Sequence, residues 1–261
     1  MNNSEQTEKL LNIVKKLRSP EGCPWDRRQT SESMLPCLLD EVYEFFEAVD
    51  EGNREMVKEE LGDILMQVVF HSQLAHERGD FSYRDVVETI SEKLIRRHPH
   101  VFSSNKASDE KEILRNWEDI KRKEKGKEKR KYLTDGIPEA LPALFKAEKF
   151  QKRLARSGFD WDNIPPVLDK VEEEFKEFRE AVENNDQVNA EEELGDIMFA
   201  LVNVARHKVI SAEDALRKTI DKFKKRVNHI EDRLNNSGKR FEETDLEVLD
   251  SYWEEAKSEL E

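Results

Sequence analysis

The sequence predicts an all-α protein built from two tandem helical-bundle domains. Apolar residues recur at helical spacing, and we find no run of the strict alternation that marks a strand. With only 9 Gly and 8 Pro in 261 residues, long helices joined by short connections are favoured over many strands. A pattern of carboxylates also occurs twice, with the second copy 133 positions after the first, which indicates a duplicated domain.

Each copy of the pattern predicts a pair of amphipathic helices. In the first copy, the segment Met34–Asp50 precedes an apolar stripe at Leu61, Ile64, Leu65, Val68 and Val69. In the second copy, Pro166–Glu183 precedes the matching stripe at Leu194, Ile197, Met198, Leu201 and Val202. Each of these helices can bury its apolar face while one edge carries carboxylates.

The repeat continues beyond these helices and gives the domain boundaries. Lys93 and Arg97 correspond to Lys222 and Arg226, and the segment 117–121 corresponds to 253–257. The offset between the copies varies from 129 to 136, as expected when helices are kept and loops change length. We predict an N-terminal domain at 1–121, a charged segment at 122–135 and a C-terminal domain at 136–261. The charged segment either extends the preceding helix or forms a solvated linker.

Composition excludes several classes of function. The formal net charge of −14 argues against general nucleic-acid binding, which needs a basic surface. The two cysteines, Cys23 and Cys37, fit no zinc spacing and are interpreted as free thiols in a reducing cytosol. The polar N-terminus and the lack of a long apolar stretch predict a cytoplasmic protein that does not enter a membrane.

The carboxylates of the second copy predict a metal site. Glu174 and Glu177 share one helical face, and so do Glu193 and Asp196. If the two helices pack antiparallel, the four side chains converge, and a divalent cation offsets their mutual repulsion. Ligands that are all oxygen favour Mg²⁺ or Mn²⁺ over zinc. An isolated Glu-Glu-x-x-Glu is usually a solvated surface, but the repeat at fixed spacing is hard to explain by solubility alone.

The chain resembles the MazG nucleotide pyrophosphohydrolases, which belong to the all-α NTP pyrophosphatases. Glu-Glu-x-x-Glu followed by Glu-x-x-Asp is the pattern of that family. Further matches are Gly22-Cys-Pro-Trp-Asp26, the segment 60–71, Arg96-Arg-His-Pro-His-Val-Phe102, the segment 136–144 and Ser157-Gly-Phe-Asp-Trp161. The resemblance covers nearly the whole chain. It implies Mg²⁺-dependent hydrolysis of nucleoside triphosphates to a monophosphate and pyrophosphate, helical-bundle domains and a homodimer.

The resemblance also assigns roles to residues. It implies that the four carboxylates of the second copy are metal ligands. It gives the same role to their counterparts in the first copy, which are Glu41, Glu44, Glu60 and Asp63. Glu173 and Glu192 then contact the nucleotide or support the ligands, and either could orient or deprotonate the attacking water. Asn189 stands where the family pattern predicts a Lys, which puts one nucleotide contact in doubt.

Cationic and aromatic residues are the candidate nucleotide contacts. Lys170, Lys222 and Arg226 are expected to hold phosphates as the α–β phosphoanhydride breaks. Trp253 and Lys257 are expected to stack on the base and to contact a phosphate, although Trp253 could instead anchor the last helix. Because four carboxylates and a triphosphate carry roughly eight negative charges, more than one metal ion or several cations are required.

The two domains are not expected to be equivalent. Cys37 stands at the position of Lys170, and the shorter Asp40 at that of Glu173. We therefore predict that the C-terminal domain carries most of the hydrolysis, over a broad range of bases. The alternative is a helical regulatory or scaffold protein that binds nucleotides without turnover. A coiled-coil interaction protein is weakened by the embedded acidic residues and the lack of sustained heptads.

Overall fold

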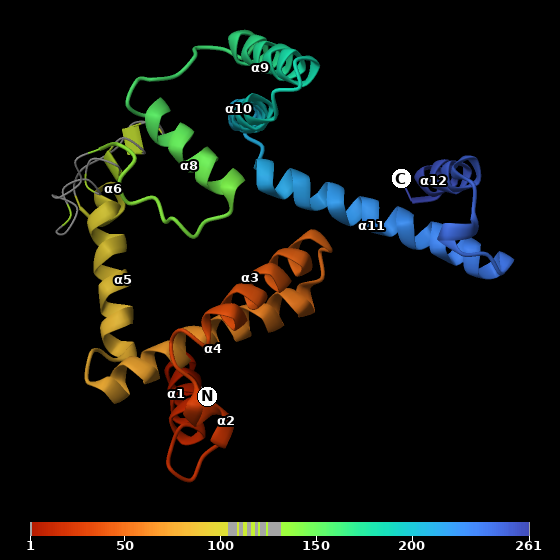
Figure 1. Ribbon diagram of the computed structural model, residues 1–261. Coiled ribbons are helices and arrows are strands. Elements are labelled where there is room, and N and C mark those ends of the chain that lie inside the picture. The colour runs from red at the N-terminus through yellow and green to blue at the C-terminus, as the bar shows by residue number, and fades with distance from the viewer. Residues whose placement is uncertain are drawn as a thin grey trace. The chain divides into compact units, whose positions relative to one another are not determined.

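The computed structural model describes residues 2–103, 109, 112–113, 116–117, 120, 124 and 132–260. Over this part of the chain the elements are helices, with no strand (Figure 1). The predicted all-α class is therefore confirmed. Among the described residues, no helix combines the length and apolar character needed to cross a membrane.

The chain divides into two compact units, residues 1–128 and 129–261. The division falls within the predicted charged segment at 122–135. Most of that segment lies outside the described residues, so its helical or linker character stays a prediction, as do the exact domain boundaries.

The first unit is organised around a long helical hairpin. Its described helices are α1 (Asn3–Leu17), α2 (Pro24–Arg28), α3 (Leu35–Asp50), α4 (Arg54–Arg78), α5 (Tyr83–Arg97) and α6 (Pro99–Phe102). Gly52, at φ 66°, makes the turn from α3 to α4, and the Asn53 side chain caps α4 by accepting a hydrogen bond from the Met56 backbone N–H at 3.3 Å. A small core joins α1 to this hairpin, with Val14, Met34, Val69, Phe70 and Leu74 buried together.

The second unit repeats the hairpin and adds another. It contains α8 (Ala143–Ala155), α9 (Pro165–Glu183), α10 (Gln187–His207), α11 (Ala212–Ser237), a 3-10 turn at Phe241–Glu243 and α12 (Leu246–Leu260). Helices α9 and α10 form the counterpart of the α3–α4 hairpin, and α12 packs back along α11 (Figure 1). Helix α8 is tied to α10 by a hydrogen bond that the Gln151 side-chain N–H donates to the Phe199 carbonyl at 2.7 Å.

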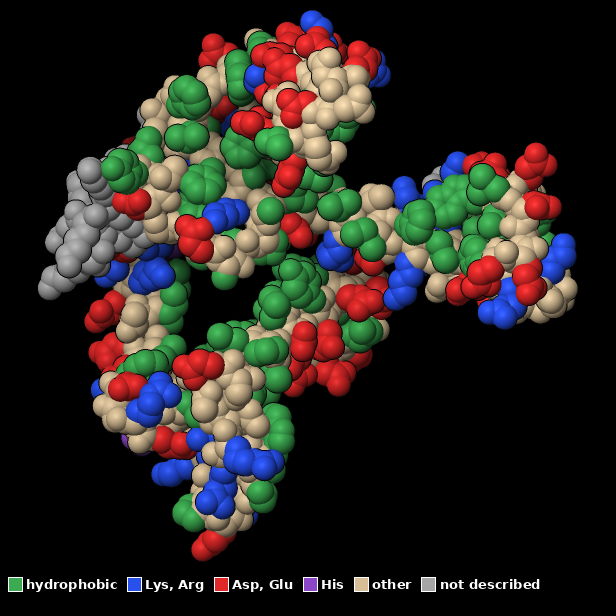
Figure 2. All heavy atoms as spheres, in the orientation of Figure 1, with side chains coloured by type: hydrophobic (Ala, Val, Ile, Leu, Met, Phe, Trp, Pro, Cys, Tyr) green, Lys and Arg blue, Asp and Glu red, His purple; other side chains and the backbone are tan. Residues whose placement is uncertain are grey.

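The predicted helices are confirmed closely, but their apolar stripes are buried only in part. The expected segments 34–50 and 166–183 are observed as α3 and α9, each within one residue at its start. Val69 is fully buried, whereas Leu61 and Leu65 are 50% and 44% exposed, and Leu194 in the second unit is 44% exposed. Within the described part of each unit, these apolar side chains are therefore only partly covered. Apolar side chains are accordingly visible on the surface in Figure 2.

Candidate metal centre

Three predicted ligands of the second unit meet between α9 and α10. Glu174 and Glu177 lie one turn apart on α9, and Glu193 faces them from α10. One carboxylate oxygen of each lies within 4.8 Å of the others. Glu174 is only 6% exposed, so this group is not simply a solvated helix face.

The charges of this cluster are poorly compensated at Glu193. Burial raises the pKa of the Glu193 carboxyl, and the negative charges of Glu177, Glu174 and Asp196 raise it further. One oxygen of Glu193, Oε2, is buried without a hydrogen-bond partner in the described structure. A buried acceptor without a partner, surrounded by other carboxylates, is a suitable position for a divalent cation.

Lys170 supplies one positive charge to the cluster. Its Nζ lies 2.8 Å from Glu174 and 2.9 Å from Glu173, one helical turn away on the same face of α9. Hydrogen bonds to Glu174 and then Glu173 raise the pKa of the Lys170 ammonium. Lys170 is therefore charged and is positioned at the edge of the carboxylate group.

The other residues predicted on α9 and α10 lie around this group. Asp196 stands outside the set of three, but its charge and that of Glu192 raise the pKa of Glu193. Glu173 and Glu192 are exposed, so both are accessible from solvent. Asn189 lies in the first turn of α10, where its backbone N–H donates a hydrogen bond to the Asp186 side chain that caps the helix.

The predicted residues of α11 and α12 form a separate group. The Arg226 guanidinium lies 5.2 Å from the ring centroid of Trp253, and Phe223 packs against the same ring with centroids 5.0 Å apart. Lys222 is exposed on α11, and the Nζ of Lys257 pairs with Glu254 at 2.5 Å. These contacts place Trp253 between α12 and α11, and they are compatible with either of the two roles that the sequence left open for it.

The first unit has a corresponding group of carboxylates, but one of the three residues that form it is not at the matching position. Glu41 of α3 meets Glu60 and Asp63 of α4, again with oxygens within 4.8 Å of one another. Glu44 is not one of these three residues, but its negative charge affects the pKa of two of them. Burial first, then the charges of Asp63 and Glu44, raise the pKa of Glu41, and burial and Glu44 raise that of Glu60.

Cys37 distinguishes this unit from the second. Its side chain packs against the buried core of α1, α3 and α4, where the corresponding residue of the second unit is the charged Lys170. The first carboxylate group therefore has no lysine at this position, as the sequence indicated.

A third ionic group was not found by sequence reasoning. His229 of α11 faces Glu255 and Glu259 of α12, with nitrogen–oxygen distances of 3.9 and 3.8 Å. Arg233 also pairs with Glu255, so this carboxylate already has a cationic partner, and we interpret the group as an ionic contact that holds α12 on α11. The spacing of Glu255 and Glu259 was a signal, but their partner on α11 depends on tertiary packing.

Comparisons with known proteins decide the family. The sequence profile of the "MazG nucleotide pyrophosphohydrolase domain" matches residues 29–102 and 166–231. The chain is 48% identical over 250 residues to "Nucleoside triphosphate pyrophosphohydrolase/pyrophosphatase MazG" of Thermotoga maritima, covering 96% of this chain and 95% of that protein. It belongs to the MazG family.

Two further proteins are similar to nearly the whole of this chain. "Nucleoside triphosphate pyrophosphohydrolase" of Escherichia coli K12 is 44% identical over 257 residues, which is 97% of each chain. "Uncharacterized protein YabN" of Bacillus subtilis is 46% identical over 246 residues, which is 94% of this chain but 50% of that protein. The two MazG segments contain both carboxylate groups, which confirms the tandem arrangement.

Proposed function

We propose that this protein hydrolyses nucleoside triphosphates, with ribose or deoxyribose and over a broad range of bases, to a nucleoside monophosphate and pyrophosphate. The printed names of the two relatives that match along almost their full lengths describe this class of enzyme. The observation that carries the proposal is the convergence of Glu174, Glu177 and Glu193 between α9 and α10.

The reaction is proposed to depend on Mg²⁺, with Mn²⁺ as a substitute and more than one ion at each site. The donor set fits these ions, because it consists only of carboxylates and includes the unpartnered Oε2 of Glu193. Glu174, Glu177, Glu193 and Asp196 are the proposed ligands. When bound, the metal supplies charge that polarises phosphate oxygens and lowers the pKa of water.

The surrounding side chains are proposed to position the substrate and the water. Glu173 and Glu192 are exposed beside the group, and either can accept a proton from water that attacks the α-phosphorus. Attack there breaks the α–β phosphoanhydride and releases pyrophosphate. Lys170 is placed to exchange its carboxylate partners for a phosphate oxygen, offsetting charge as the bond breaks.

A homodimer is proposed to complete this arrangement. The half-exposed stripes at Leu61, Leu65 and Leu194 give the two hairpins apolar faces that a second copy could cover. Lys222, Arg226, Trp253 and Lys257 are gathered on α11 and α12, whereas the ligands lie on α9 and α10. Association of two chains is a way to bring such groups to one substrate. A cytoplasmic location is proposed with it.

A product assay tests the proposed reaction. The purified full chain is incubated with Mg²⁺ and each canonical or deoxynucleoside triphosphate, and monophosphate and pyrophosphate are quantified. Equimolar products are expected. Glu193→Gln, which removes the central ligand charge, is expected to lower kcat/KM by about a hundredfold or more.

Glu191→Gln is the matched control, because Glu191 lies on the same helix and is exposed to solvent. It should leave the rate nearly unchanged. Nucleotide binding without any product would instead support the regulatory or scaffold protein. Equal losses in the two variants would remove the argument for a metal centre at Glu193.

A further inference from the structure

The two carboxylate groups hold their first glutamate in different ways. In the second unit, the Nζ of Lys170 lies 2.8 Å from Glu174, so a cation of the same helix already offsets part of the negative charge. Glu41 is the counterpart of Glu174 in the first unit, and the residue four positions before it is Cys37, which packs against the apolar core. A different residue therefore contacts Glu41.

Gln67 of α4 is that residue. It follows Asp63 by four positions, so it lies one helical turn beyond this carboxylate on the same face of α4. Burial, and then the charges of Asp63 and Glu44, raise the pKa of Glu41, whereas the amide of Gln67 acts to lower it. The amide is therefore directed at Glu41, across the contact between α3 and α4.

The polar atoms of Gln67 are buried without being satisfied. The residue is 1% exposed, and neither its amide oxygen nor its amide nitrogen has a hydrogen-bond partner of ordinary geometry in the described structure. An amide left in this state carries a large desolvation cost. Its nitrogen can donate to Glu41, and its oxygen can accept from water that coordinates a cation at the group. The arrangement therefore favours a bound cation beside Gln67.

The second unit has no amide at this position. Ala200 stands 133 positions after Gln67 and is also buried, at 8% exposed. Two positions thus differ together between the units, with cysteine and glutamine in the first and lysine and alanine in the second. A neutral amide leaves the negative charge of its group in place. The charged residues that act most on the pKa values of Glu41 and Glu60 are accordingly all carboxylates.

We propose that the first carboxylate group binds a divalent cation in the absence of nucleotide, and that Gln67 is the positioning residue that holds Glu41 for it. The choice of a divalent cation rests on the proposed function. At the second group, a cation has to displace Lys170 from Glu174, and this becomes favourable when a nucleotide phosphate accepts the ammonium group instead. The first group therefore fills with free metal, and the second fills with metal and nucleotide together.

Titration of the full chain with Mn²⁺ alone tests this inference. Free Mn²⁺ is measured by electron paramagnetic resonance without nucleotide, so the readout does not depend on hydrolysis. We expect wild type to show a tight class of bound ions and a second class that is about tenfold weaker. Glu60→Gln should abolish the tight class and leave the weaker one. A single class of equal sites, or loss of the tight class in Glu193→Gln instead, would overturn the inference.

Gln67→Met tests the positioning role, because methionine has a similar length and volume but no amide. The tight class is expected to weaken by about tenfold, as is usual when a residue that holds a metal ligand is lost. The weaker class should be unchanged, and circular dichroism verifies that the helices form. A folded Gln67→Met that binds Mn²⁺ as wild type does would refute the role of Gln67.

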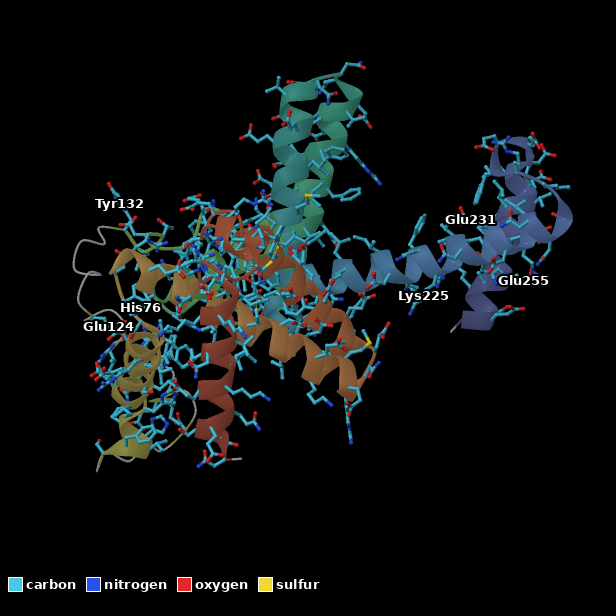
Figure 3. All side chains as sticks on the ribbon, turned by 90° about the horizontal axis from the view of Figure 1, so that it is seen from below. His76, Glu124, Tyr132, Lys225, Glu231 and Glu255 are labelled. Carbon is cyan, nitrogen blue, oxygen red and sulfur yellow. The ribbon has the colours of Figure 1, made fainter. Side chains whose placement is uncertain are left out.

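Gln73→Met is the matched control for this substitution. Gln73 belongs to the same helix and lies one turn before His76, which is labelled in Figure 3 and marks the end of α4 away from the carboxylates. Its side-chain N–H donates a hydrogen bond to Glu77 at 2.9 Å. Gln73→Met should therefore keep both classes of bound ions. A loss of the tight class here would show that any polar substitution on α4 has this effect.

Lys170→Gln tests the difference between the two groups. It removes the cation beside Glu174, so the weaker class should bind Mn²⁺ about tenfold more tightly without nucleotide. Lys176→Gln is the control, because Lys176 is an exposed lysine of α9 that pairs with Glu180. No gain in Lys170→Gln would contradict the proposed order of filling. Failure of the proposed function would appear separately, as absence of product from wild type, and would leave these binding results unchanged.

Discussion

At the scale of single residues, Arg18 links α1 to α4 through one well-defined ion pair. Its Nε and Nη2 donate hydrogen bonds to Glu77, at 2.9 and 2.7 Å, while its guanidinium lies 5.2 Å from the Phe70 ring centroid. The hydrogen bond from Arg18 is the largest cause of the lowered pKa of Glu77. The residue therefore ties the ionic contact to the small core of the first unit.

This ion pair predicts a loss of stability in acid. Because the folded pKa of Glu77 is below its unfolded value, the stabilisation is present above the unfolded pKa and is lost as pH falls through the folded pKa. Glu77 is 36% exposed, so the contribution is expected to be about 1 kcal/mol or less. Urea unfolding of wild type and Glu77→Gln from about pH 7 to pH 3 should show two curves that converge in acid.

Glu51→Gln serves as the control, since Glu51 is an exposed residue of the turn after α3. Its curve should stay parallel to that of wild type. A constant difference between wild type and Glu77→Gln across the whole range would contradict the role given to Arg18.

At this scale the sequence predicted that carboxylates of two helices come together, but not which of them lie nearest to one another. The spacing of Glu174, Glu177 and Glu193 on two helices was enough to place them together, because helical periodicity fixes the face that each residue occupies. The sequence could not predict that Glu124 would bind Arg97, because that contact joins residues 27 positions apart and depends on how the chain returns to α5.

At the scale of elements, the connection between α10 and α11 contains an unfavourable residue. Val209 has φ 59°, in the left-handed region, and it follows Lys208, the C-cap residue of α10. The Ile210 backbone N–H bonds to the Ala205 carbonyl at 2.8 Å, which is the pattern that usually places glycine at this position. A β-branched side chain is strained there, and that of Val209 is 95% exposed, so it gains no packing in return.

Val209→Gly is therefore expected to stabilise the second unit, by about 1 kcal/mol. Val188→Gly is the matched control, because Val188 is also exposed but lies within α10, where glycine weakens a helix. Denaturant unfolding measured by circular dichroism should move in opposite directions for the two variants. A lower stability for Val209→Gly would show that the valine is not strained.

The same connection shows why some element boundaries follow from sequence and others do not. Helix α4 ends at Gly79, with φ 78°, and glycine at a helix end is a recognisable stop signal. Helix α10 ends before Val209, and nothing in a Lys-Val-Ile sequence signals a left-handed turn. The start of α11 is again readable, because Ser211 accepts a hydrogen bond from the Asp214 N–H at 3.3 Å as its cap.

At the scale of the whole molecule, the sequence predicted two related units. It did not predict how much of each apolar stripe is buried within its unit. The repeat is a property of the chain and is visible without a structure. The half-exposed stripe of Leu61 and Leu65 was not foreseen, because periodicity shows which face is apolar and not whether another helix covers it. Completion of the hairpins by a second copy stays a proposal.

The two units are expected to differ in activity, and a pair of matched substitutions measures this. Glu44 and Glu177 are corresponding residues, both exposed, and each lies one turn after a carboxylate of its group. Lys170 stands beside the second group, whereas Cys37 packs into the core near the first. Glu177→Ala should therefore lower kcat/KM by about a hundredfold or more, and Glu44→Ala by no more than about threefold. Equal losses would mean that the two groups contribute alike, so that the lysine at position 170 gives the second unit no advantage.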